Sequence, residues 1–530
     1  MVYAIKLFLA VSLLMAIAAP FLRKRFGGLL SQKEYWQVWF VIFGSAVVSF
    51  LSLKPYIFVV GVAVGALITL NLFGKDAKGR VATFWLLLLL FPPVSLSTDG
   101  LAGFNRVLDL NHLRVLSILV LLPGAFSLAT DRHIRVPAAM RWTDAFVLAF
   151  PLLRLITAAP TSTLTSTVRL AVEMFLDVLL PYFVTTRGLR SAADLKFVVS
   201  RMALGLAYLA VVALLETLLR KNVYTELEFI YGVRWTATHQ LWRGPFLRVD
   251  GTTPQPIIFA FVMMTAFALW SWLRATGGVL LGQGRMVAFL LFVAFILTWS
   301  RGPLLGFVGF LGCLLALRRM PPMRFLSLLV ILVIVGGIAY ASGAEQYAYE
   351  ALKSVFGSSA EETSTIDYRR KLLEASLALI KQSPVWGVPN YTAYLQDLRQ
   401  GEGIIDLVNT YVAVMLSAGL VGLACFLAPH LFVLYRLLKH IRPAAERSRL
   451  LGGSFPIAFA ALTVAALFVI FTTSTYSIVA AMLLFMIAVP SAWLAMTPEE
   501  RKLADAGEEA PAGGHGRRAP LPVFANRGMW

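Results

Sequence analysis

Arginines in polar stretches of an otherwise apolar chain are the residues best suited to chemistry. The stretch 343–407 carries Arg369 and Arg370, a shorter polar stretch carries Arg248, and Arg301 interrupts an apolar run. Guanidinium groups stay charged at neutral pH and bind phosphate through paired N–H donors. We therefore expect these side chains to bind an anionic ligand.

The remainder of the chain must hold these residues in a membrane. Of its 530 residues, 58% are hydrophobic and only 14% are charged, whereas soluble domains have about a quarter of their residues charged. Apolar runs of about 17–25 residues, long enough to cross a bilayer, recur along nearly the whole sequence. The sequence predicts an all-α fold, a polytopic membrane helix bundle of about 14–15 transmembrane helices, with a large external loop carrying short amphipathic helices.

Two polar loops divide the expected spans into three groups. The spans lie near residues 2–21, 36–53, 55–73, 81–97, 113–129, 142–157, 166–186 and 197–219, then 256–274, 286–300, 303–317 and 325–342, and finally 408–437, 455–472 and 475–496. This predicts N-terminal transmembrane helices (1–219), a loop (220–255), central transmembrane helices (256–342), a large loop (343–407) and C-terminal transmembrane helices (408–496). The tail (497–530) is rich in Ala, Gly, Pro and charge, so we expect it to be disordered.

The placement of charge predicts the orientation. The net charge is +19, but its basic residues cluster in short loops such as 23–25, 187–196 and 318–324. Two spans separate successive clusters, so the positive-inside rule places all of them in the cytoplasm and both polar loops outside. Topology thus explains the charge, and we expect no nucleic-acid partner. Basic residues follow the first apolar run instead of preceding it, which favours a retained span over a signal peptide.

Each arginine also has a structural explanation. Long loops escape the charge bias, Arg301 can extend to the membrane interface, and Arg248 can pair with Asp250. We favour a functional role for Arg301 because an ionisable residue at membrane depth is costly. We favour one for Arg369 because the positive-inside bias disfavours arginines in outside loops.

Local patterns predict how the arginines are positioned. A helix break is expected at Gly302-Pro303, next to Arg301, because proline lacks a donor and glycine loosens the chain. An amphipathic helix is expected from Arg369, with Asp367 near its cap. Its face is made by Leu372, Leu373, Ser376, Leu379 and Ile380.

Other motifs that would bring cofactor chemistry do not stand out. Cys313 and Cys425 lie in apolar segments without a partner at metal-ligand spacing, so we expect buried free thiols. We find no phosphate-cradling glycine loop, no metal cluster and no Ser-His-Asp order. We therefore expect no cofactor and no metal.

Five short elements resemble, in order, those of the O-antigen ligase and polysaccharide polymerase family of bacterial inner membranes. They are Arg-x-x-Gly at Arg248, Ser-Arg-Gly at Ser300, Arg-x3-Leu at Arg369, a proline with a Gly-x-x turn at Gly387, and Asn-x9-Gly-x-x-Gly at Asn409, Gly419 and Gly422. The resemblance covers roughly residues 248–427, and the close helix contacts that Gly419 and Gly422 allow fit it.

The resemblance implies a glycosyltransferase at the periplasmic face of a bacterial inner membrane. Its donor would be an undecaprenyl-diphosphate-linked glycan and its acceptor a glycan or lipid, with membrane lipids and other polysaccharide-assembly proteins as further partners. Arg301 and Arg369 would bind the diphosphate without a metal, with Arg248 and Arg370 as secondary contributors. Asn409 would position a sugar or the loop.

One departure from the family matters. Its ligases carry a histidine just before that asparagine, proposed to take the acceptor proton, and this chain has Val408 there. Either Asp406 acts as the general base, or the chemistry needs no base at this position. The loss favours a polymerase over a ligase.

Two other classes stay open. A lipid-linked oligosaccharide flippase or polysaccharide exporter would also need basic residues, but in a central cavity and with internal repeats, of which we find no convincing example. A non-catalytic partner in an envelope-glycan machine is the third possibility.

Overall fold

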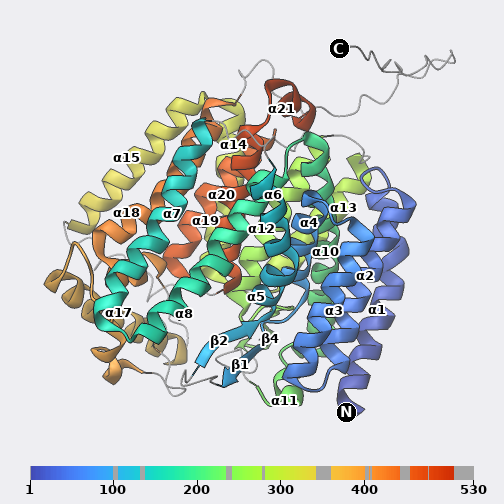
Figure 1. Ribbon diagram of the computed structural model, residues 1–530, viewed down its shortest axis with the longest axis horizontal. Coiled ribbons are helices and arrows are strands. Elements are labelled where there is room, and N and C mark those ends of the chain that lie inside the picture. Colours follow the sequence, from blue (N-terminus) through green and yellow to red (C-terminus); the bar gives the residue numbers. More distant parts are fainter. Residues whose placement is uncertain are drawn as a thin grey trace.

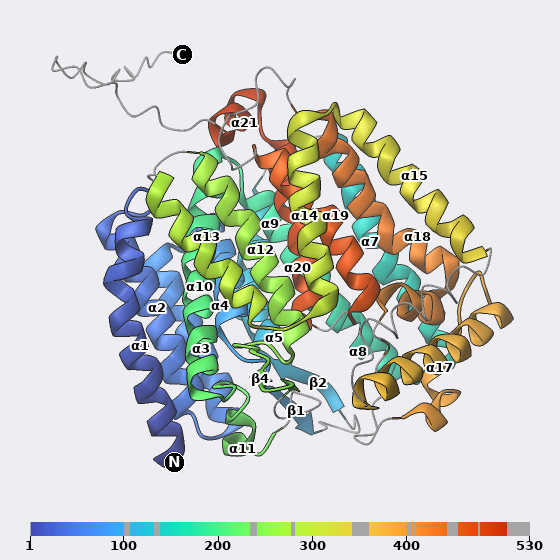
Figure 2. The same ribbon diagram turned by 180° about the vertical axis from the view of Figure 1, so that it is seen from behind.

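The computed structural model describes residues 2–99, 106–131, 138–233, 241–276, 281–341, 360–399, 405, 407, 409–441, 454–474 and 477–505. These residues form a bundle of long helices with two short β-hairpins at one end (Figure 1). The hairpins, α11 (Leu227–Tyr231) and α17 (Ala360–Gln382) lie at this end, and α21 (Pro498–Asp505) lies at the opposite one, as Figure 2 shows from behind. We call the first the site end and the second the basic end.

The elements follow one another as a series of helices with few strands. The N-terminal part contains α1 (Val2–Phe26), α2 (Gln32–Leu51), α3 (Pro55–Phe73), α4 (Ala77–Leu90), β1 (Ser95–Asp99), β2 (Arg106–Asn111), α5 (His112–Leu116), η1 (Ser117–Leu121), α6 (Leu122–Thr130), α7 (Ala138–Ala158), η2 (Ala159–Thr161), α8 (Leu164–Met174), η3 (Phe175–Leu179), α9 (Leu180–Gly188) and α10 (Ala192–Leu219). The central part contains β3 (Trp242–Arg243), β4 (Phe246–Leu247), α12 (Pro256–Ala275), α13 (Leu281–Ile296), α14 (Arg301–Arg319) and α15 (Pro322–Ala341). The C-terminal part contains η4 (Tyr391–Ala393), η5 (Gln396–Leu398), α18 (Thr410–Lys439), α19 (Phe455–Val469), η7 (Ile470–Thr472) and α20 (Ser477–Ala495). Strands β1 and β2 pair antiparallel, as do β3 and β4.

The predicted all-α polytopic membrane class is confirmed. Among the described residues, eleven helical segments are long and apolar enough to cross a membrane. The other four predicted spans fall on α4, α8–α9, α13 and α15. Helix α4 has only 14 residues because it ends at Leu90, where Phe91 and two prolines follow, and the π-helical turn η3 interrupts α8–α9. The two cysteines are free thiols and only partly buried.

Helix α10 is the centre of the bundle and packs against α1, α4, α12 and α13. It begins at a capping box, in which Ser191 and Asp194 each accept a hydrogen bond from the other's backbone N–H. Arg220 ends it in a left-handed conformation. Because its residues from Val198 to Ala213 are all buried, α10 is a fixed support for the loops that leave its ends.

Loops that are far apart in sequence meet at the basic end. Lys78 forms an ion pair with Asp194 at 3.6 Å, and Lys196 Nζ donates to the Leu503 carbonyl oxygen of α21 at 3.3 Å. Glu500 of α21 accepts from the backbone N–H of Ala192 at 2.8 Å. The tail that was expected to be disordered from residue 497 therefore starts with an ordered helix, while residues 506–530 lie outside the described part.

Helix α18 is broken at Gly419, where φ is 64° and ψ is −164°. The turn that follows α17 fills the break. Val388 N donates to Leu416 O at 2.6 Å, and Leu420 N donates to Pro384 O at 2.9 Å. Backbone groups freed by a broken helix are costly unless they find partners, so the turn and the break stabilise each other. The close approach at Gly419 is thus made by a loop, whereas the sequence predicted a helix.

The Gly419→Ala substitution should destabilise the protein. A Cβ atom at this position would collide with Val385 O, and a backbone conformation reserved for glycine costs other residues about 1–3 kcal/mol. Gly309→Ala is the matched control, because a Cβ added there meets no atom within 4 Å. Thermal unfolding in detergent, followed by size-exclusion chromatography, should give a lower midpoint for Gly419→Ala alone. Equal midpoints would show that the interlocked turn contributes nothing.

Candidate active site

Arg248 lies at the site end, between β4 and α12, and its guanidinium group binds the turn that precedes α14. Its Nε atom donates to Thr298 O at 3.1 Å, and its Nη2 atom donates to Ser300 Oγ at 3.0 Å. The next residue, Val249, donates its N–H to Leu297 O at 3.2 Å. Three hydrogen bonds from two adjacent residues therefore fix the arginine against the turn.

The turn between α13 and α14 is held in an unusual conformation. Trp299 has a φ of 48°, in the left-handed region that L side chains rarely adopt. The ring of Phe246 stacks on Trp299 with 4.5 Å between centroids, and Arg243 Nη1 donates to Trp299 O at 2.7 Å. The β3–β4 hairpin thus holds the turn on one side while Arg248 binds it from the other.

The helix break falls before the position that the sequence predicted. Helix α14 begins at Arg301, so Gly302 and Pro303 lie within its first turn. A proline is tolerated there because the first N–H groups of a helix have no intrahelical partner. Gly302 instead allows close packing, since a Cβ at this position would collide with Thr472. Arg301 is left half-buried at the start of the helix.

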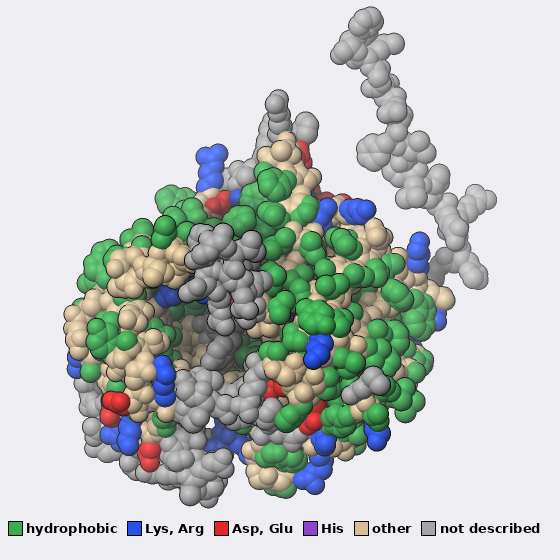
Figure 3. All heavy atoms as spheres, turned by 60° about the horizontal axis from the view of Figure 1, so that its bottom comes forward, with side chains coloured by type: hydrophobic (Ala, Val, Ile, Leu, Met, Phe, Trp, Pro, Cys, Tyr) green, Lys and Arg blue, Asp and Glu red, His purple; other side chains and the backbone are tan. Residues whose placement is uncertain are grey.

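Three other arginines come within electrostatic reach of Arg248. Burial and the neighbouring charges of Arg243, Arg369 and Arg301 lower the pKa of Arg248 to about 10, against an opposing effect of Asp250. Figure 3 shows this end of the molecule hollowed, with lysine or arginine side chains beside the hollow. We call Arg243, Arg248, Arg301 and Arg369 the arginine cluster.

Helix α17 positions Arg369 by packing onto the first half of α18. Its buried residues Leu372, Leu379 and Ile380 form a separate apolar cluster with Val412 and Leu416. Burial of such side chains stabilises by about 1.5–3 kcal/mol each. The packing fixes the register of α17 and therefore the place of Arg369.

Two details of α17 differ from the prediction. The helix begins at Ala360, so Asp367 lies inside it and does not cap it. Leu373, which was assigned to the apolar face, is 39% exposed. The fully buried face consists of Leu372, Ser376, Leu379 and Ile380, and Tyr368, Ala375 and Leu377 are partly buried beside it.

The other predicted site residues are Arg370, Asn409 and Asp406, which do not belong to the arginine cluster. Arg370 Nε donates to Glu374 Oε1 at 2.8 Å on the exposed face of α17. Asn409 caps α18, and its Oδ1 atom accepts from the N–H groups of Tyr411 and Val412. The cap leaves the Nδ2 donor of Asn409 for other contacts. Asp406, like Val408, lies outside the described residues.

Glu216 supports the Arg248 loop and was missed in the sequence. It is fully buried near the end of α10. One carboxylate oxygen accepts from the N–H groups of Asp250 and Gly251, at 3.2 and 3.1 Å, and the other accepts from Val223 N at 2.9 Å. A carboxylate inside an apolar span was the available signal. Arg243 was also missed, because only the tertiary structure brings it to the cluster.

Asp250 does not pair with Arg248, contrary to the structural explanation for that loop. Its Oδ2 atom accepts from Thr225 Oγ1 at 2.9 Å, and the residue is only 4% exposed. Burial, with Glu216 as a second cause, raises the pKa of Asp250 well above its usual range. The two carboxyl groups therefore support the loop that carries Arg248, and neither forms an ion pair with Arg248.

Comparison with known proteins finds a family match for the part of the chain that contains this site. Residues 286–427 match the family model described as O-antigen ligase. The matched segment contains Arg301, Arg369 and Asn409 and begins after Arg248. The predicted resemblance is thereby confirmed. No curated protein matches the chain. Within the described residues, no group of three or more His, Cys, Asp and Glu side chains is arranged to hold a metal ion.

The Asp250→Asn variant should change the pH dependence of stability. Because the folded state raises the pKa of this carboxyl, the fold favours the protonated form. The stability it contributes is full below the unfolded pKa of about 4 and is lost as pH rises through the folded value. Asparagine does not titrate, so the unfolding midpoint of the variant should gain on that of the wild type as the pH rises above the unfolded pKa of about 4. A difference that stays constant with pH contradicts this assignment.

Proposed function

We propose that this multi-pass membrane protein, whose residues 286–427 match the O-antigen ligase family model, transfers glycan from an undecaprenyl-diphosphate carrier. The convergence of Arg248, Arg301 and Arg369 on one place supports this proposal most directly. The three residues come from three segments, and each had been assigned to the site from the sequence alone. The transfer would take place at the site end of the bundle.

The chemistry requires concentrated positive charge. As the glycosidic bond breaks, the leaving diphosphate gains negative charge that fixed guanidinium groups stabilise. Arg301 begins α14, and the N-terminus of a helix also attracts phosphate. We assign diphosphate binding to Arg301 and Arg369, with Arg248 and Arg370 as secondary contributors, in a reaction that needs no metal ion.

The acceptor side of the reaction depends on the segment before α18. We propose Asp406 as the general base that activates or orients the acceptor hydroxyl, and Asn409 as a residue that positions a sugar through its amide donor. Val408 stands where ligases of the family have a histidine. This favours polymerisation of oligosaccharide units, as in exopolysaccharide or O-antigen synthesis, over ligation.

The orientation follows from charge. Basic loops meet at the end of the bundle that holds α21, and the positive-inside rule places that end in the cytoplasm. The site end would then face the periplasm of a bacterial inner membrane. The position of the arginine cluster at one end favours an enzyme over an exporter, in which charge would line a path through the membrane.

Alanine substitution of Arg301 or Arg369 should reduce polymer formation by about 10²–10³-fold, because each removes a donor to the leaving diphosphate. Arg370→Ala is the matched neighbour. Its side chain pairs with Glu374, so we expect a loss below about tenfold. The measurement is incorporation of labelled repeat units in isolated membranes, at equal protein amounts. If Arg369→Ala and Arg370→Ala behave alike, the assignment of Arg369 is wrong.

Deletion of the gene separates the two reactions of the family. Surface glycan reduced to single repeat units is the expected result, because a polymerase joins them. Gel analysis of surface and carrier-linked glycan provides the measurement. Accumulation of full-length chains on the carrier lipid would instead identify a ligase.

A further inference from the structure

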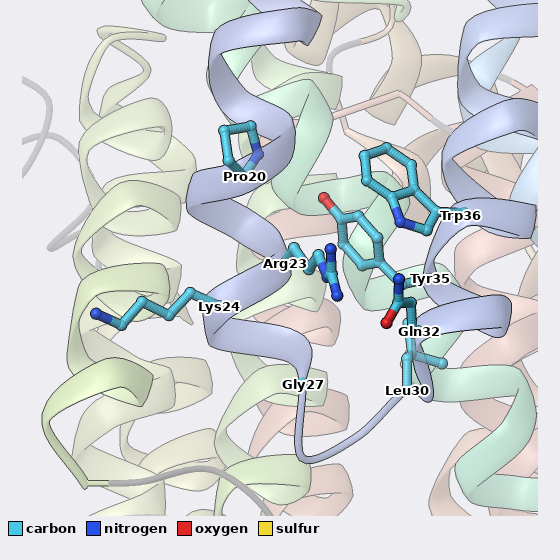
Figure 4. Close-up of a pocket in the computed structure, with 8 residues that line it drawn as sticks. All are labelled: Pro20, Arg23, Lys24, Gly27, Leu30, Gln32, Tyr35 and Trp36. Carbon is cyan, nitrogen blue, oxygen red and sulfur yellow. The ribbon is translucent and has the colours of Figure 1, made fainter.

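A pocket lies at the basic end, between the last turn of α1 and the first turns of α2, and the proposed reaction does not use it. Its volume is about 460 Å³. Arg23, Gln32, Tyr35 and Trp36 line it, together with Gly27 of the connecting loop (Figure 4). Two basic residues, Arg23 and Lys24, and several polar or aromatic groups thus border a space large enough for a phosphate headgroup.

The charge in this pocket belongs to Arg23. Figure 4 shows its guanidinium group beside Tyr35 and Gln32, whereas Lys24 extends to the other side of α1. Arg23 lies 6.0 Å from the centre of the Trp36 ring. In the part of the chain that the structure describes, no acidic side chain forms an ion pair with Arg23. Glu34, the nearest acid in sequence, instead binds Arg201 at 2.8 Å. The pocket is therefore positive.

The pocket adjoins the apolar outer surface of the bundle. On α2, Trp36, Phe40 and Phe43 recur at helical spacing and are 42%, 56% and 39% exposed. On α1, Leu13 and Ile17 are each 64% exposed. Such a surface faces lipid in a membrane protein, and tryptophan is favoured at the level of the headgroups. A bound anion in the pocket would therefore lie next to acyl chains.

We propose that this pocket binds the phosphate of an anionic phospholipid, with the acyl chains lying along the exposed apolar faces of α1 and α2. Arg23 supplies the charge and Gln32 an exposed amide, whereas the Tyr35 ring forms part of the wall because its hydroxyl already donates to Ala19 O at 2.6 Å. A free phosphate would have the same polar partners but would leave the adjoining apolar surface unused. The site is independent of the arginine cluster, which lies at the other end of the bundle.

Native mass spectrometry of the detergent-solubilised full chain tests this proposal with phosphatidylglycerol as the probe. Arg23→Gln should weaken phosphatidylglycerol binding about fivefold, the effect of one basic residue near an anionic lipid. Lys33→Gln is the matched control, because it removes the same charge from an exposed position at the same end, outside the pocket. Arg23→Lys should keep most of the binding, which separates loss of charge from misfolding.

Three results would overturn the proposal. Equal weakening by Arg23→Gln and Lys33→Gln would show that general surface charge is responsible. Equal retention of phosphatidylcholine by the wild-type protein would show that the anionic headgroup is not recognised. Displacement of phosphatidylglycerol by equimolar glycerol phosphate would assign the pocket to a soluble anion.

Discussion

Repulsion among guanidinium groups is the constraint on which the site end depends. Arg248 is held near Arg243, Arg301 and Arg369, and their charges lower its pKa. One backbone oxygen and one hydroxyl accept the hydrogen bonds that its side chain donates. Like charges held close together in a partly buried place raise the free energy of the folded state. An anion bound among them would remove that cost, so the cluster favours a ligand with concentrated negative charge.

Two broken helices make this arrangement possible. The turn before α14 places Arg301 at a helix start and supplies the acceptors for Arg248 and Arg243. The break in α18 receives the turn that follows α17, and this anchors the helix that carries Arg369. Irregular backbone at membrane depth persists only where protein groups satisfy it. The strained and broken segments therefore lie where the candidate site is built.

The sequence predicted the membrane spans and the arginines of this site better than it predicted how they are arranged in space. Hydrophobic run lengths located the spans, and arginines in polar loops are visible as single residues, so Arg248, Arg301 and Arg369 could be selected. The position of the helix break could not be predicted, because it depends on the left-handed Trp299 and on Phe246 stacked against it.

The supporting residues were harder to predict for the same reason. Glu216 is far from Asp250 and Gly251 in sequence, and only the folded chain brings its carboxylate to their N–H groups. Asp250 turns toward Thr225, away from the nearby Arg248 that proximity in sequence favoured. Local sequence patterns predict the elements and the candidate residues. They do not predict which residues distant in sequence form hydrogen bonds with one another.

Direct binding of the carrier lipid is the decisive measurement. Undecaprenyl diphosphate should bind the wild-type protein more tightly than undecaprenyl monophosphate, and an Arg301→Ala, Arg369→Ala double variant that still folds should lose that difference. If the double variant keeps the wild-type preference for the diphosphate, the arginine cluster does not bind the leaving group and the account is contradicted.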